Sequence, residues 1–369
     1  NSIAFGAAAS SSGANSIAIG AASVATQPNT FVIGSAAQAC GVNSGSIGAA
    51  ATANGDDSLA IGVASFANTA NSLALGTRAN ASGANATAIA SGATALGTNA
   101  TAIGKSSSAS GRDSVALGVL ATASNTSSMA LGTNSTALGM NATAIATNAA
   151  ATGENSLAVG VCAAASQLSA IAIGTLSVAN SVNATAISAG AQALANNAVA
   201  IGVCSVASAA NAQAFGVNAS ATGVNSVAIA VSSNALGNNS MAIGMLTVAN
   251  GVNAVAIASS AQANGSNSIA FGVAANANGA NTMAMGTSSL ASQTGAIAIG
   301  ADSEASANFT LAMGVASLAN ANNATAIGHA ATAISTNALA LGLFANASGP
   351  VALAIGMYAN ASQQDSFAA

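Results

Sequence analysis

The sequence predicts an all-β protein, a parallel β-solenoid built from 14-residue coils, and three observations support this prediction. The chain repeats every 14 residues from Asn1 without an insertion or deletion, which gives 26 full repeats and a partial one at residues 365–369. Apolar and small residues alternate with a period of two inside each repeat, as is typical of strands. Asn, Ser and Gly recur where one strand would give way to the next, which favours turns there.

The repeat positions, numbered 1–14 from Asn1, differ sharply in how variable they are. Position 1 is Asn in 19 of the 26 full repeats, position 4 is Ala in 24 and position 11 is Ala in 25. Position 5 is Ile, Leu, Val, Phe or Met in all 26, and position 6 is Gly in 21. This pattern disfavours a helix, because each Gly in a helix interior costs about 1 kcal/mol.

Each repeat is expected to contain two short strands, at positions 2–5 and 8–12, with turns near positions 6–7 and 13–1. In the seventh repeat these strands would cover residues 86–89 and 92–96. Gly at position 6 and Asn at position 1 tolerate the positive φ that tight turns require. Coils stacked about 4.8 Å apart would make residues 1–369 a single solenoid domain on the order of 125 Å long.

The pattern leaves two assignments of the inner and outer faces open. In the one we favour, Ala at positions 4, 9 and 11 fills a narrow interior and the large residue at position 5 points outwards. In the other, position 5 lies inside and a flat row of alanines lies outside. The outward-pointing ladder of the first assignment begins with Phe5, Ile19, Ile33, Ile47 and Ile61. Such a long apolar stripe would not stay in water, so we expect a homotrimer or a comparable bundle of chains.

The repeat resembles the YadA-like head repeats of trimeric autotransporter adhesins. Residues 15–23, NSIAIGAAS, carry the motif, and residues 57–65, DSLAIGVAS, and 239–247, NSMAIGMLT, come close to it. The resemblance covers the whole chain. It implies a left-handed parallel β-roll, three identical chains around one axis and a place on the bacterial surface. Because no stalk, neck or anchor is recognisable, the chain would be an excised head or a fibre subunit that uses the same roll.

Composition excludes several functional classes. Charged residues make up 3% of the chain and the net charge is −4, so no basic surface for nucleic acid is expected. No apolar run approaches the 18 residues of a membrane helix and no signal peptide is visible, so we expect no membrane insertion by this segment. The three cysteines, Cys40, Cys162 and Cys204, form neither a disulfide framework nor a CxxC metal motif. Cys162 and Cys204 lie three coils apart, too far for a bridge.

No catalytic, cofactor-binding or metal site is predicted, and we expect a protein that is not an enzyme. Asp302 and Glu304 fall at positions 8 and 10, on the outer face of one predicted strand, but two carboxylates supply too few oxygens for Ca²⁺. His329, the only histidine, is expected in a solvated turn. The acidic residues at position 1 are interpreted as turn residues: Asp57, Asp113 and Asp365.

The predicted function is that of an extracellular adhesive or structural rod on the cell surface, whose partners are copies of itself and a matrix or cell-surface ligand. The alternative is a self-assembling extracellular filament whose first and last coils, bare of charge, stack end to end. An ice-binding solenoid is a minor alternative, because the threonines at position 3 are not consecutive enough for a flat ladder. These are Thr87, Thr101, Thr143, Thr185 and Thr325.

Overall fold

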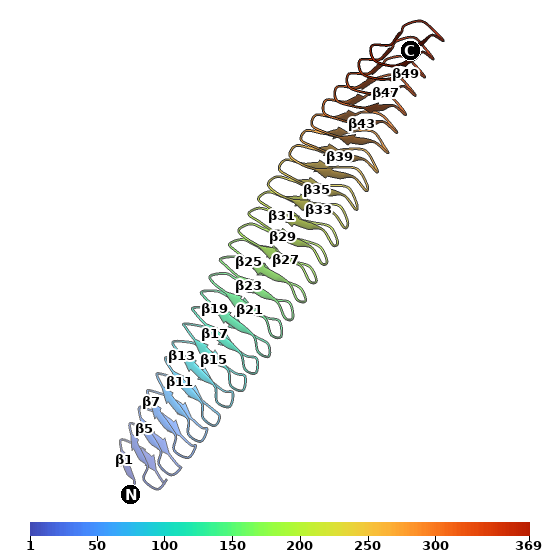
Figure 1. Cartoon of the computed structure of the whole chain (residues 1–369). Coiled ribbons are helices and arrows are strands. Elements are labelled where there is room, and N and C mark those ends of the chain that lie inside the picture. Colours follow the sequence, from blue (N-terminus) through green and yellow to red (C-terminus); the bar gives the residue numbers. More distant parts are fainter. The chain divides into compact units, whose positions relative to one another are not determined.

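The computed structural model describes residues 1–369, and every regular element in it is a β-strand. The chain forms two compact units, unit 1 at residues 1–183 and unit 2 at residues 184–369, each described by itself. Within each unit, short strands lie one above another, and one coil follows the next every 14 residues (Figure 1). The prediction of an all-β parallel β-solenoid is therefore confirmed.

Each coil contributes two strands, and their bounds repeat with the sequence. The odd-numbered strands cover positions 3–5, from β1 (Ile3–Phe5) to β51 (Leu353–Ile355). The even-numbered strands cover positions 10–11, from β2 (Ser10–Ser11) to β52 (Asn360–Ala361). The last strand, β53 (Phe367–Ala368), has two residues. Odd strands hydrogen-bond only to odd strands and even strands only to even strands, so each unit has two parallel sheets, sheet A and sheet B.

The register between coils is constant, because each residue pairs with the residue 14 positions later. In β13 (Thr87–Ile89) and β15 (Thr101–Ile103), Thr87 lies opposite Thr101 and Ile89 lies opposite Ile103. In sheet B, β14 (Thr94–Ala95) pairs in the same way with β16 (Ser108–Ala109). A single inserted residue would turn every following side chain of its strand to the other face, which explains the strict repeat length.

The strands are shorter than predicted, because position 8 belongs to a turn and not to the second strand. Residues at position 8 have φ near +55°, as in Ala22, Cys162 and Leu176. Backbone hydrogen bonds to the previous coil hold this conformation, as from Leu120 N to Lys105 O at 3.0 Å. The turns therefore cover positions 6–8 and 13–1. Positive φ at Gly in position 6 and Asn in position 1 is confirmed.

Glycine at position 6 is favoured by the close approach of neighbouring coils. A Cβ added to Gly118, where φ is +133°, would lie 2.4 Å from the carbonyl oxygen of Gly132 in the next coil. No L-residue fits that distance without moving the backbone. Five coils have Ala or Ser instead, with smaller φ values between 96° and 113°: Ala90, Ala146, Ser188, Ala230 and Ala258.

The interior of each coil is filled by small side chains, and the face assignment that we favoured is confirmed. Alanines at positions 4, 9 and 11, such as Ala88, Ala93 and Ala95, are fully buried, whereas the residue at position 5 points away from the interior. The largest fully buried side chain is Val32. Since the interior holds almost nothing larger than Ala, Ser and Thr, most of the large apolar side chains lie on the outside.

Buried hydroxyl groups complete the core at position 9, which was predicted to lie inside, and at position 2, which was not. Ser16 at position 2 donates a hydrogen bond from Oγ to the carbonyl oxygen of Gly13 at 2.7 Å. Ser23 at position 9 donates from Oγ to the carbonyl oxygen of Gly20 at 2.9 Å. These two hydroxyls thus satisfy their own donors while they fix the adjoining turns, whereas a few others at position 2, such as that of Ser58, have no partner.

Candidate interaction surfaces

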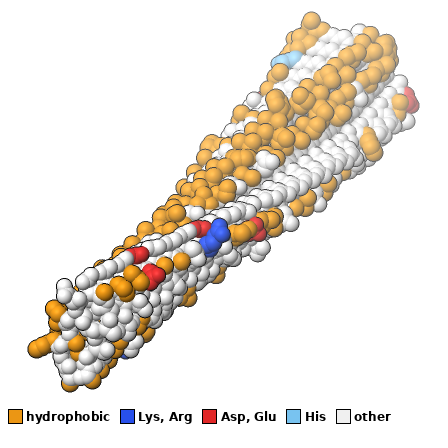
Figure 2. Space-filling view, turned by 90° about the horizontal axis from the view of Figure 1, so that it is seen from below, with side chains coloured by type: hydrophobic (Ala, Val, Ile, Leu, Met, Phe, Trp, Pro, Cys, Tyr) orange, Lys and Arg blue, Asp and Glu red, His pale blue; other side chains and the backbone are white.

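Each coil presents four surfaces to its surroundings. The apolar face is the outer side of sheet A, at positions 3 and 5, and the polar face is the outer side of sheet B with the residue that follows it, at positions 10 and 12. The first turn edge comprises positions 6–8 and the second turn edge positions 13, 14 and 1. In Figure 2, hydrophobic side chains gather in long bands beside rows that have few of them, and charged side chains are sparse.

The apolar face carries large side chains that remain partly exposed in the single chain. Ile19 keeps 38% of its surface exposed, Ile33 44% and Ile103 38% in unit 1, and Phe271 keeps 51% in unit 2. Neighbouring rungs are in direct register, as Ile103 lies opposite Ile89 on one side and Leu117 on the other. The face is therefore a continuous ladder of half-buried apolar groups within each unit, which is a surface suited to packing against another protein.

The polar face presents mainly hydroxyl and amide groups, with single large apolar side chains such as Phe66 and Leu96 exposed among them. In sheet B, Thr94, Ser108, Thr122 and Thr136 follow one another in consecutive coils at position 10. At position 3 of sheet A, by contrast, no more than two threonines are adjacent, as in the Thr87–Thr101 pair. A flat and extended threonine ladder, which ice binding would require, is therefore not formed on the apolar face.

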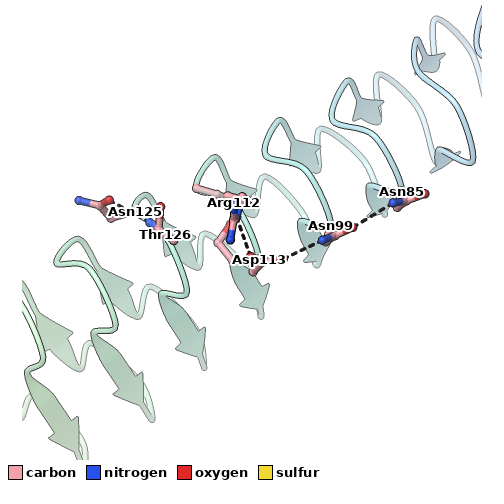
Figure 3. Close-up of polar contacts among 8 residues, drawn as sticks. Asn85, Asn99, Arg112, Asp113, Asn125 and Thr126 are labelled. Atoms are coloured by element: carbon pink, nitrogen blue, oxygen red, sulfur yellow. Dashed lines mark hydrogen bonds and ion pairs between the residues drawn. The ribbon is translucent and has the colours of Figure 1, made fainter.

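A ladder of side-chain amides runs along the second turn edge at position 1. Asn85 Nδ2 donates to Asn99 Oδ1 at 3.0 Å, and Asn99 Nδ2 donates to Asp113 Oδ1 at 2.7 Å (Figure 3). The guanidinium of Arg112 also donates from Nε to Asp113 Oδ2 at 2.9 Å. The hydrogen bond from Asn99, followed by that from Arg112, holds the pKa of the Asp113 carboxyl below its ordinary value. Asp113 thus ends one run of the ladder as a charged acceptor.

Exposed apolar and aromatic side chains mark the first turn edge. Leu120 and Leu176 in unit 1 are 52% and 61% exposed, although their φ values are positive. In unit 2, Phe344 stacks on Tyr358 with ring centroids 5.2 Å apart, and His329 meets Phe344 edge to face at 5.4 Å. His329 lies in a turn as predicted, but beside an aromatic neighbour that the sequence analysis did not foresee.

The polar residues that the sequence analysis considered do not come together as a chemical site. Asp302 lies in a turn with φ of +55°, whereas Glu304 begins β44 (Glu304–Ala305), so the prediction that both lie on one strand was wrong. No group of three His, Cys, Asp or Glu side chains is placed to hold a metal ion. Cys40, Cys162 and Cys204 are free thiols. None of the chain forms a helix of the length and apolarity that a membrane span needs.

The sequence of the chain matches a known family of repeats. The model of the YadA head domain repeat matches successive segments that together cover most of the chain, from residues 1–23 to residues 333–359. The sequence matches no curated protein. Among solved structures, the collagen-binding domain of the Yersinia adhesin YadA is 20% identical and covers 54% of this chain and 79% of its own, with a TM-score of 0.14. Because the family model accounts for so much of the sequence, the chain belongs to the YadA head domain repeat family, a family of structural adhesins.

Proposed function

We propose that the chain forms the head of an adhesive rod at the bacterial cell surface, with three identical chains around one axis. The observation that carries this proposal is the apolar face, a ladder of large side chains that the single chain leaves partly exposed. Full burial of a large apolar side chain contributes about 1.5–3 kcal/mol in all, and each side chain of this face has part of that still to gain from a partner. A ring of three chains that turns its apolar faces towards the axis covers all of them at once.

This arrangement leaves the polar face directed outwards, where it meets the partner. That face carries almost no charge and many hydroxyl and amide groups, such as Thr94, Ser108 and Thr122. Contacts to a matrix protein or a cell surface would therefore depend on hydrogen bonds and on the apolar side chains scattered among these groups. Adhesion is expected to change little with salt, because charge attraction is what salt screens.

The test combines assembly and adhesion on the purified chain. Light scattering is expected to give the mass of three chains, and a soluble monomer at all concentrations would refute the assembly. Binding to collagen-coated surfaces and to cultured cells is then compared with a variant in which Thr94, Ser108 and Thr122 become Lys. We expect the variant to remain trimeric and to bind less. If the unmodified trimer binds neither the coated surface nor the cells, the adhesive role is wrong.

Electron micrographs of the same sample address the filament alternative. Separate short particles are the result expected from an adhesin head. Polymers that grow end to end with concentration would favour the self-assembling filament subunit instead.

A further inference from the structure

The charged side chains of unit 1 are divided between its two turn edges. Arg78 and Lys105 occupy positions 8 and 7 on the first turn edge, where unit 1 has no acidic residue. All four acidic residues of the unit lie at positions 14 and 1 on the second turn edge: Asp56, Asp57, Asp113 and Glu154. The third basic residue, Arg112, also lies there and is already paired with Asp113. The first edge is therefore positive and the second edge is negative.

Neither basic side chain of the first turn edge has an acidic partner in its own chain. Arg78 and Lys105 are exposed, and the single ion pair of the chain is the one between Arg112 and Asp113. Asp57 accepts a hydrogen bond from Asn43 Nδ2 at 2.9 Å and is otherwise exposed. Both edges thus carry charge that remains available to another molecule.

A closed ring of identical chains brings unlike edges together. In cyclic symmetry each subunit uses one surface towards the next subunit and a different surface towards the previous one. If the apolar faces point to the axis, the first turn edge of each coil meets the second turn edge of the neighbouring chain. The charge on these two edges of unit 1 is opposite, as such a contact requires.

The basic residues of the first turn edge and the acidic residues of the second also lie at similar levels along the axis of the unit. A closed ring allows no axial shift between neighbours, so residue numbers can be compared directly. At about 4.8 Å per 14 residues, Arg78 lies about 7 Å above the level of Asp57, and Lys105 about 3 Å below the level of Asp113. Both gaps are within the reach of long basic side chains and within the screening length of about 8 Å at physiological salt.

Resting on the three-chain assembly proposed above, we propose that the first turn edge of unit 1 docks against the second turn edge of unit 1 in a second copy. Arg78 and Lys105 of one copy then face Asp57 and Asp113 of the next. The pairs fix which edge meets which and the direction of the neighbouring chain, because an antiparallel neighbour would present the acidic levels in reverse order. The apolar face supplies most of the affinity, and the charged edges set the orientation.

The test is a cycle of charge reversals followed by dilution in analytical ultracentrifugation. One variant carries Arg78→Glu and Lys105→Glu, a second carries Asp57→Lys and Asp113→Lys, and a third carries all four changes. An exposed ion pair changes an equilibrium about twofold, so two pairs at each of three interfaces weaken assembly by tens of fold in either single-edge variant. The four-residue variant is expected to regain most of this loss, because its edges are complementary again.

The cycle separates docking from local damage to the amide ladder. The variant with Asp57→Lys and Asp113→Lys and the four-residue variant disturb the ladder equally, so only docking can account for a difference between them. A neutral variant, Arg78→Gln with Lys105→Gln, serves if a reversal does not fold, and it should lose the salt dependence that the unmodified assembly shows. Additive losses without recovery, or an unaltered salt dependence in the neutral variant, would overturn the docking while the trimer stands. An unmodified chain that stays monomeric would overturn the proposed assembly and the docking with it.

Discussion

Replacing three rungs of the apolar face with aspartate is the most direct way to test how the chain assembles. Ile89, Ile103 and Leu117 lie in consecutive coils and in direct register on sheet A. Ile103 keeps 38% of its surface exposed, and the other two are half-buried. Ile103 therefore has somewhat more than a third of its burial still to gain from a partner, and Ile89 and Leu117 have at most about a third.

The expected magnitude follows from that remaining third. Full burial of a large aliphatic side chain contributes about 1.5–3 kcal/mol, so each rung gains up to roughly 0.5–1 kcal/mol on assembly. Three rungs in each of three chains give up to about 5–9 kcal/mol, which is on the order of a thousandfold in association. A carboxylate buried in their place costs several kcal/mol more. The triple variant is expected to be monomeric at micromolar concentration.

A matched control is available in the same three coils. Thr94, Ser108 and Thr122 are in equally direct register on sheet B, so aspartates there repel one another as strongly but face outwards. Light scattering at micromolar concentration should find this control trimeric and the apolar-face variant monomeric. If both variants assemble equally well, the apolar face is not the interface and the reasoning fails.

Three further predictions concern the coil itself, and each is tested by the effect of a substitution on unfolding. Gly118→Ala should destabilise the fold by a few kcal/mol, because the added Cβ would lie 2.4 Å from the Gly132 carbonyl oxygen. Gly92→Ala is the control and should cost much less, because its Cβ would lie 3.4 Å from the nearest atom, Ser106 Oγ. Equal denaturation midpoints for the two variants would contradict this. Ser114→Ala removes a buried hydrogen bond to the carbonyl oxygen of Gly111 and should lower the unfolding free energy by about 1 kcal/mol. Ser58→Ala should be nearly neutral, because Ser58 Oγ has no hydrogen-bond partner. The lowered pKa of Asp113 should add stability that is fully present above roughly pH 4 and lost as the pH falls through the folded-state pKa. Asp113→Asn should remove this part of the dependence of unfolding stability on pH. A pH dependence that is unchanged in the variant would count against it.

Much of the fold could be predicted from the sequence because the repeat applies the same constraints 26 times. Nearly constant alanines at positions 4 and 11 identify the interior, since only small groups fit between two opposed sheets. Gly at position 6 marks the place where neighbouring coils approach closely, and Asn at position 1 marks the turn residue with positive φ. These positions agreed with the structure because local preference and packing favour the same residues there.

The full extent of the first turn could not be predicted, because position 8 has no consistent composition. Gly, Asn and Asp, which tolerate positive φ, occupy it in only a few coils, whereas the others have Ala, Ser, Leu, Cys, Arg, Phe or Tyr there. The hydrogen bond from each position-8 N–H to the previous coil, as from Tyr358 to Leu343 O at 2.9 Å, selects the conformation instead. Partners between coils are invisible in a local pattern, so the second strand was predicted too long and Asp302 was placed on it.

The candidate surfaces were only partly predictable for a related reason. The position-5 ladder follows from strand alternation, so it was expected. The ion pair of Arg112 with Asp113 and the stack of Phe344 on Tyr358 depend on which neighbours share a turn edge, and that requires the three-dimensional register. The division of charge between the two edges of unit 1 likewise becomes visible only when positions 7, 8, 14 and 1 are placed in space.

The distribution of side-chain size between inside and outside implies that folding and assembly are linked. Fully buried side chains are almost all Ala, Ser or Thr, whereas the Ile, Leu, Met and Phe residues at positions 3 and 5 lie outside. A single chain thus has little of the burial that normally offsets the entropy of ordering. The unfolding midpoint should rise steadily over a hundredfold increase in concentration, because a partner that binds only the folded chain stabilises it by mass action. A midpoint independent of concentration would show that the alanine interior and the backbone ladders suffice alone, and that the apolar face is not needed for folding.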